Sequence, residues 1–232
     1  MSVDARALSA ISSVPRTGAD NVATPFRAQR DGALFTSEWT LGLAMEGRVY
    51  VGNAGTASDT VTFGAGPIDT TEPDFDLSIP AGTLAIPLEI RIYMERYDTS
   101  NTQFECMASV GTGGSQGATT TAVNARNIRA DAPNTSLATA VAASSSDATY
   151  MTSNVAEFWR DGQQATITKT GASATVSSQD PVLFIWRYSD SLVAPIMYSS
   201  SVVSRLNVFA SSAAGTGFIT VTWAELPDTA IA

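Results

Sequence analysis

The sequence of 232 residues predicts an all-β protein that folds as an antiparallel two-sheet sandwich. Apolar and polar residues alternate with a period of two in about nine to eleven segments, which is typical of half-buried strands. Tight turns and one excursion of about forty residues separate these segments, and no regular succession of strands and helices indicates a parallel sheet. A single domain is the better expectation for an all-β chain of this length.

The first part of the chain, residues 1–33, is expected to form an N-terminal arm outside the sandwich. The segment 3–11 matches one face of a short helix, but Pro15 and Pro25 exclude a longer one. The remainder, residues 34–232, is expected to form the sandwich domain.

The first strands of this domain are predicted close together in the sequence. One is expected over 39–46, and short strands are expected at 48–51 and 59–63 around a turn rich in Gly, Asn and Ser. In the first of them, four large apolar residues alternate with smaller or polar ones: Trp39, Leu41, Leu43 and Met45.

The clearest alternation lies in the centre of the chain. Strands are predicted over 74–79, 86–95 and 104–110. In the longest of these, charged residues of both signs share one face, which indicates pairing across strands or contact with solvent. The other face is expected to carry five apolar residues: Ile86, Leu88, Ile90, Ile92 and Met94.

A long insertion is expected at about 111–149, where the alternation stops. Gly and Ser clusters begin and nearly end this stretch, and only 136–143 has helix potential. Loops of this length in a compact domain are usually functional or disordered.

The last third of the chain returns to strands. Residues 155–159 and 165–170 are predicted to form a hairpin with Asp161-Gly162 at its turn. The strand over 181–188 is apolar on both faces, so burial on both sides is expected. Strands at 201–209 and 217–225 complete the set, which fits a single jelly roll, a fold with about eight strands and long loops between its sheets.

Small neutral residues take the place of charged residues in this chain. Ala, Thr and Ser occur 35, 28 and 26 times, whereas charged residues make up 15%. Soluble domains usually have about 25% charged residues. This composition excludes a coiled coil, a highly charged disordered chain and a disulfide scaffold.

The charge balance argues against direct, strong binding of nucleic acid. The formal net charge is −9, and Lys169 is the only lysine beside twelve arginines. The densest basic stretch is the first thirty residues, where Arg6, Arg16, Arg27 and Arg30 face two aspartates. Phosphate binding draws on clustered Lys and Arg, and this net charge of +2 is too weak for a genome-binding arm. No segment approaches the ~20 apolar residues of a membrane helix.

No nucleophile in the sequence has the partners that catalysis needs, and the protein is not expected to be an enzyme. Residues 113–117 match G-x-S-x-G, but that serine needs a histidine base and the chain contains none. The single cysteine, Cys106, lies in an alternating segment and is interpreted as a small buried apolar residue.

The acidic residues offer only weak candidates. Glu72, Asp74 and Asp76 precede or begin a strand and resemble part of a calcium site, but charge at a strand start is the simpler interpretation. A glycosidase needs two paired carboxylates, and the sequence does not pair any of Glu89, Glu95, Glu105 and Glu157. We therefore expect no catalytic, cofactor-binding or metal-binding residues.

The four tryptophans have two interpretations. A sugar-binding sandwich would expose some of them as a stacking platform, whereas a packed core would bury them. All four lie in apolar alternation, which favours the core: Trp39, Trp159, Trp186 and Trp223.

Two segments resemble strands of viral jelly-roll capsid proteins. They are 74–94, with Asp-Phe-Asp-Leu-Ser-Ile-Pro-Ala-Gly-Thr followed by Leu-Glu-Ile-Arg-Ile-Tyr-Met, and 217–227, which resembles a final capsid strand that runs into a short tail. The resemblance is one of pattern over 34–227. It is strongest to small, single jelly-roll major capsid proteins of icosahedral viruses, some of which enclose an internal membrane.

This resemblance implies a structural subunit of an icosahedral shell, located in the virion. Its partners would be other copies of itself, other capsid proteins and, in the membrane-containing group, an internal membrane. The lack of a basic arm fits a membrane or protein layer between shell and genome. The scarcity of lysine fits a surface that is largely interface, and it equally fits a genome rich in G and C.

Two alternatives remain open from the sequence. A receptor- or carbohydrate-binding sandwich, such as a virion spike, fibre head or adhesin, would expose an aromatic or acidic groove. An enzyme would need a pocket with carboxylates of shifted pKa, since histidine is absent.

Overall fold

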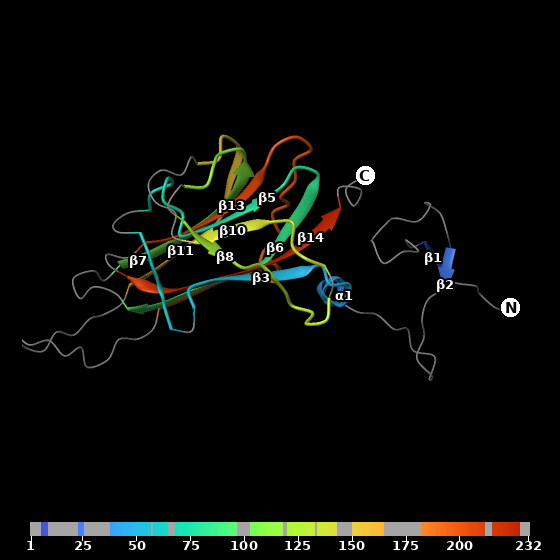
Figure 1. The fold of residues 1–232 in the computed structure, drawn as a ribbon, viewed down its shortest axis with the longest axis horizontal. Helices are drawn as coiled ribbons and strands as arrows, with labels where there is room; N and C mark the ends of the chain where they lie inside the picture. The colour runs from blue at the N-terminus through green and yellow to red at the C-terminus, as the bar shows by residue number, and fades with distance from the viewer. Residues whose placement is uncertain are drawn as a thin grey trace, which may run out of the picture.

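The computed structural model confirms the all-β class and the two antiparallel sheets (Figure 1). It describes eleven stretches of the chain: 6–8, 23–25, 38–56, 58–64, 68–96, 103–117, 120–132, 134–142, 150–164, 182–211 and 215–227. Within them, no helix has the length and apolar character that crossing a membrane requires.

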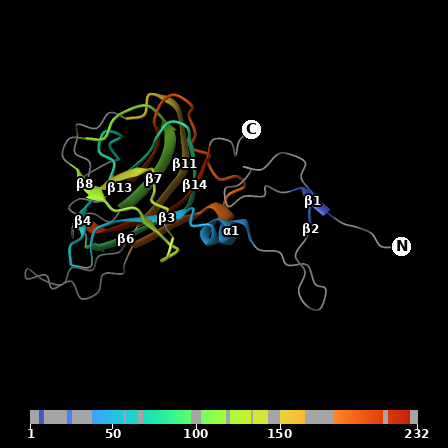
Figure 2. The ribbon, with the colours of Figure 1, turned by 45° about the vertical axis from the view of Figure 1, so that its right-hand side comes forward.

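Two six-stranded sheets face each other and enclose the core (Figures 1 and 2). The first, which we call the β13 sheet, has the order β11 (Ser153–Gln164), β7 (Gln103–Thr112), β13 (Ser204–Ser211), β5 (Phe75–Ile79), β10 (Thr139–Ala142) and β8 (Thr121–Val123). The second, the β14 sheet, has the order β12 (Val182–Arg187), β6 (Thr83–Arg96), β14 (Thr216–Pro227), β3 (Val49–Ala54) and β9 (Arg126–Asn127), with β4 (Val61–Thr62) also beside β14.

Eight of these strands are five residues or longer, and successive strands along the chain mostly belong to different sheets. Numbered 1 to 8 along the chain, they are β3, β5, β6, β7, β11, β12, β13 and β14. The β14 sheet then has the order 6-3-8-1 and the β13 sheet the order 5-4-7-2. The chain therefore changes sheet at every step except between the fourth and fifth strands, β7 and β11.

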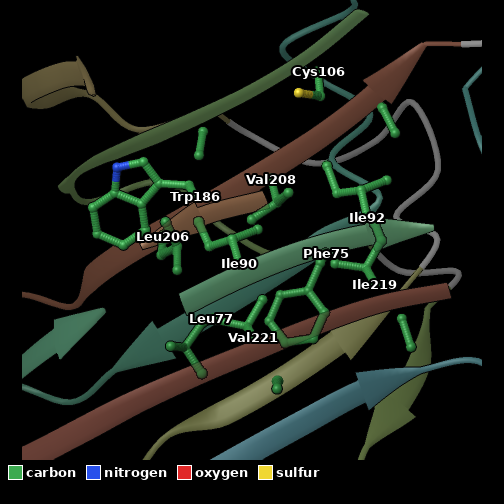
Figure 3. Close-up of a cluster of buried hydrophobic side chains, with 14 of the residues drawn as sticks. Phe75, Leu77, Ile90, Ile92, Cys106, Trp186, Leu206, Val208, Ile219 and Val221 are labelled. Carbon is green, nitrogen blue, oxygen red and sulfur yellow. The ribbon is translucent and has the colours of Figure 1, made fainter. Parts of the chain in front are cut away.

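The core lies between the sheets and is built from alternate residues of the central strands (Figure 3). Full burial of one such side chain stabilises the fold by about 1.5–3 kcal/mol. The predicted alternation of β5 and β14 is confirmed. The side chains that meet across the two sheets include Phe75, Leu77, Leu206 and Val208 from one and Ile90, Ile92, Ile219 and Val221 from the other.

The prediction that five apolar residues of β6 share one face is wrong for two of them. The register between β14 and β6 shifts between Thr222 and Trp223, and this places one extra residue, Leu88, in β6. Such a bulge reverses the alternation. Leu88 consequently packs in a second cluster with Val49 and Ala224, and Ile86 packs against that cluster.

The strand predicted over 39–46 is also wrong, because residues Trp39–Met45 form the helix α1. In a helix, alternating residues point to opposite sides, so only Leu43 of the four large apolar residues packs against the fold. The backbone N–H of Gly42 donates to the Glu38 carbonyl at 3.0 Å, and Leu43 and Ala44 pack against the second cluster. Trp39 and Leu41 remain exposed.

Two predictions about the later strands fail for reasons of pairing. Asp161-Gly162 is not a hairpin turn, because β11 runs through it and Gly162 pairs with Glu105 of β7. The predicted second arm at 165–170 lies outside the described residues. β12 is an edge strand that is buried on one side only, since Val182 and Phe184 are buried while Leu183 is exposed.

The segment between β7 and β11 contributes short strands to both sheets. β10 extends the β13 sheet by pairing with β5, and β9 pairs with β3 in the β14 sheet. The helix potential at 136–143 is therefore not realised. Ala138, Ala140 and Ala142 enter the core, although alanine gave this stretch no core signal in the sequence.

The N-terminal segment contains two short strands, β1 (Arg6–Leu8) and β2 (Ala23–Pro25), which pair with each other. The short helix expected there is wrong for residues 6–8, which are extended. Figure 1 shows this pair apart from the sandwich, on the side where α1 lies.

Candidate interaction surface

The G-x-S-x-G segment anchors the insertion between β7 and β11. Gly113 and Gly114 have φ angles of 76° and 78°, which favour glycine. Their carbonyl oxygens accept hydrogen bonds from the Arg205 guanidinium at 3.0 and 3.3 Å. The chain has no histidine to activate Ser115. The geometry of this segment is thus that of a structural contact.

Arg205 also forms a buried ion pair with Asp76. Its Nη1 lies 3.1 and 2.8 Å from the two carboxylate oxygens, and both residues are at most 6% exposed. Burial raises the pKa of Asp76 above its usual value, and the nearby Arg205 charge opposes that shift. Asp76 therefore does not form the calcium site considered from the sequence, because a protein cation already occupies it.

The insertion covers the outer face of the β13 sheet. The outward residues Met107, Ser109 and Phe209 are all buried. The Tyr150 hydroxyl lies 2.9 Å from the Ser109 hydroxyl, and the Tyr150 ring lies 6.2 Å from the Phe209 ring. This polar and aromatic face is consequently closed to a partner along much of its length.

Asp74 links the loop after β4 to strand β13 at the other end of the same sheet. Its carboxylate accepts hydrogen bonds from the backbone N–H groups of Gly64 at 3.0 Å and Ala210 at 2.6 Å. Burial raises the pKa of Asp74 to about 7 although these two donors oppose the shift. Among the described residues, no group of three or more His, Cys, Asp or Glu side chains is placed to hold a metal ion.

The other carboxylates considered from the sequence are not arranged as a catalytic pair. Glu89 on β6 binds Arg91 and Arg187 at 2.6 and 2.8 Å, whereas Glu157 on β11 binds Arg160 at 2.7 Å. The two glutamates therefore lie on different sheets. Glu105 is on β7, and the side chain of Glu95 lies outside the described part of the structure.

The cysteine and most tryptophans are part of the packed interior. Cys106 is fully buried, and burial raises the pKa of its thiol. Trp186 and Trp223 are buried and Trp159 packs against the core, as expected. The expectation is wrong for Trp39, which is 44% exposed because it lies on α1 rather than on a strand.

The outer face of the β14 sheet carries one exposed apolar row. Leu183, Tyr93 and Phe218 are register partners on β12, β6 and β14. The Tyr93 and Phe218 rings stack with centroids 6.4 Å apart. A neighbouring row is polar and contains Glu89 with Arg187, so the cross-strand pairing predicted for this face is confirmed.

Most exposed apolar side chains gather at one end of the sandwich, which we call the loop end. Here α1, the turn before β6, the start of the insertion and the loop from β12 to β13 meet. The Trp39 ring contacts the Tyr188 ring at 5.2 Å, and the backbone N–H groups of Gly82 and Gly113 donate to this loop. Within the described part of the chain, twelve large apolar residues are exposed, and nine of them lie there: Trp39, Leu41, Met45, Ile128, Leu137, Leu192, Val193, Ile196 and Val202.

Two arginines of the loop end form ion pairs within the chain. Arg129 pairs with Asp131 at 2.7 Å, and Arg48 lies 3.3 Å from the Glu46 carboxylate. Beside Met45, Ile128 and Arg129 line an open hollow of about 610 Å³. The sequence analysis missed this surface, although the run from Leu192 to Ile196 is apolar without alternation and signals an exposed or contacting loop.

Comparison with known protein families, with curated proteins and with solved structures finds no match to this chain.

Proposed function

We propose that this protein is a structural subunit of an icosahedral viral capsid that assembles through contacts between jelly-roll sandwiches. The observation that carries the proposal is the strand order 6-3-8-1 and 5-4-7-2. A jelly roll is a double-sheet sandwich of eight strands in two Greek keys, and capsid subunits are a principal use of that fold. The repeated change of sheet along the chain supports this topology.

The distribution of arginine supports a shell that does not hold its genome directly. Six of the seven described arginine side chains form an ion pair with a carboxylate of the same chain. No clustered, unpaired arginine patch is therefore present on the described surface. Other copies, further capsid proteins and an internal membrane are the partners that we propose, with the virion as the location.

A second candidate function is a receptor- or carbohydrate-binding module. The row of Leu183, Tyr93 and the half-buried Phe218 favours it, because exposed apolar and aromatic groups can mark a recognition surface. The Tyr93 and Phe218 rings stack on each other, however, which leaves less of their faces for a sugar. This candidate predicts a monomer or a small oligomer of fixed size.

The mass of the purified protein in solution separates the two functions. Light scattering over a concentration series, followed by electron microscopy of any large species, should reveal closed shells or regular rings of five or six subunits. A particle of constant small mass, with the Tyr93→Ser variant losing affinity on a glycan array, would favour the binding module instead. The Val155→Ser variant is the control, since Val155 is exposed on β11 in the other sheet.

A further inference from the structure

We propose that the loop end is the surface through which two copies of this chain first associate. The inference rests on the proposed function for the identity of the partner, since it names the contact from which a shell would grow. The apolar surface of the loop end is formed mainly by two segments. Trp39, Leu41 and Met45 project from α1, and Leu192 and Ile196 project from the loop between β12 and β13.

The exposed apolar area is sufficient for a stable contact. The nine apolar residues of the loop end expose roughly 1,000 Å² together, while a standard interface buries about 800 Å² on each partner. Patches of this size on soluble domains usually mark interaction sites. An isologous contact presents the same patch from both copies, so one apolar surface serves both sides.

The charge distribution favours a second protein copy at this end over an anionic lipid surface or a nucleic acid. Each copy carries a net charge of −9, so two copies repel unless they meet through a neutral patch. Ion pairs reduce this repulsion at the loop end, where Arg129 is paired with Asp131 and Arg48 with Glu46. It has no cluster of free cations for anionic lipid or nucleic acid among its described residues.

The other outer surfaces are less suitable for this contact. The insertion covers the outer face of the β13 sheet, where Tyr150 lies over Phe209. On the outer face of the β14 sheet, the large apolar residues that are exposed in the described part of the chain are Tyr93 and Leu183. The loop end thus has most of the apolar surface that is left without a partner.

Sedimentation velocity on the full chain tests the inference. The double variant Leu192→Ser/Ile196→Ser should raise the dissociation constant of self-association at least 100-fold, because it removes two apolar side chains from the contact. Leu192 is fully exposed, so the fold should tolerate the change. The control Val155→Ser/Leu183→Ser changes two exposed apolar residues outside the loop end and should associate like the unmodified protein.

Three outcomes overturn the inference. The first is a mass that stays monomeric at every concentration, and the second is a loop-end variant that associates like the control. The third is flotation of the protein with phosphatidylcholine vesicles that the loop-end variant loses, without self-association, since the occupant is then a lipid surface. Far-UV circular dichroism and the melting temperature should be unchanged in both variants.

The same samples separate this inference from the proposed function. If the unmodified protein and the loop-end variant both form closed shells in electron microscopy, the capsid role stands and the loop-end contact is wrong. If discrete oligomers form, dissolve in the loop-end variant and never close into shells, the contact stands and the capsid role is wrong.

Discussion

Replacing Arg205 by methionine should destabilise the protein by about 3–5 kcal/mol at pH 7. The substitution keeps the apolar stem of the side chain but leaves the Asp76 carboxylate, 1% exposed, without its cation. It also removes the donors to the carbonyls of Gly113 and Gly114. A typical domain is stable by about 5–15 kcal/mol, so the variant should still fold while losing a large share of its stability.

The destabilisation should depend on pH in a defined direction. Without Arg205, nothing of positive charge opposes the effect of burial, so the pKa of Asp76 rises further in the folded state. The folded variant then binds a proton more tightly than the unfolded chain, and its stability falls as the pH rises through that pKa. The difference from the unmodified protein should therefore be smaller at pH 4 than at pH 8.

Urea unfolding followed by tryptophan fluorescence measures this effect, and trypsin reports on the insertion. Cleavage after Arg126 and Arg129 should accelerate in Arg205→Met, because the insertion loses one of its anchors. The double variant Asp76→Leu/Arg205→Met should recover much of the loss, since an apolar pair leaves no buried charge. A single variant within 1 kcal/mol of the unmodified protein, or a double variant less stable than both single ones, refutes the reasoning.

Three further predictions concern charge and burial. Glu89→Gln should cost at most about 1 kcal/mol in urea unfolding and less at high salt, because its ion pairs with Arg91 and Arg187 are exposed to solvent; a cost of several kcal/mol contradicts this. Burial raises the pKa of Asp74 to about 7, so its contribution to stability is present below about pH 4 and is lost as the pH rises through 7. Asp74→Asn should flatten that slope in a pH series of urea curves, and an unchanged slope would exclude Asp74 as its cause. The buried thiol of Cys106 should react with a disulfide reagent at pH 8 only when urea unfolds the protein, whereas rapid reaction of the native protein would show an accessible site.

The strands that could be predicted are those in which apolar and polar residues alternate along the whole strand, because this pattern alone shows which face is buried. β5 and β14 alternate strictly because one face meets the core along the whole strand, as Leu77 and Val221 do. Local sequence patterns give the wrong prediction where pairing with a neighbouring strand determines the backbone conformation. Asp161-Gly162 is a favourable turn sequence, yet β7 pairs with β11 on both sides of it and keeps the strand extended. β10 could not be predicted because alanines carry little strand preference.

The contacts that build the candidate surface could not be predicted from a single sequence, because they join residues that are far apart along the chain. Asp76 and Arg205 are separated by 129 positions, and no local pattern links them. Trp39 and Tyr188 come together only because α1 packs beside the segment that follows β12. Alternation predicted Trp39 as a core residue of a strand, whereas the seven-residue helix α1 places it at the surface. The loop end therefore depends on topology more than on local composition.

The insertion between β7 and β11 has a consequence for assembly that follows from these contacts. An open sandwich of this size has two outer sheet faces and two ends as possible contact surfaces. Arg205 and Tyr150 fix the insertion over one sheet face, and Glu89 with its two arginines makes the other largely polar. In the assembly that we propose, both sheet faces are therefore less suitable for an apolar contact than the loop end. Most of the exposed large apolar residues in the described part of the chain are at the loop end. In the proposed assembly, the insertion would therefore act by covering one of the two sheet faces that could compete with the loop end.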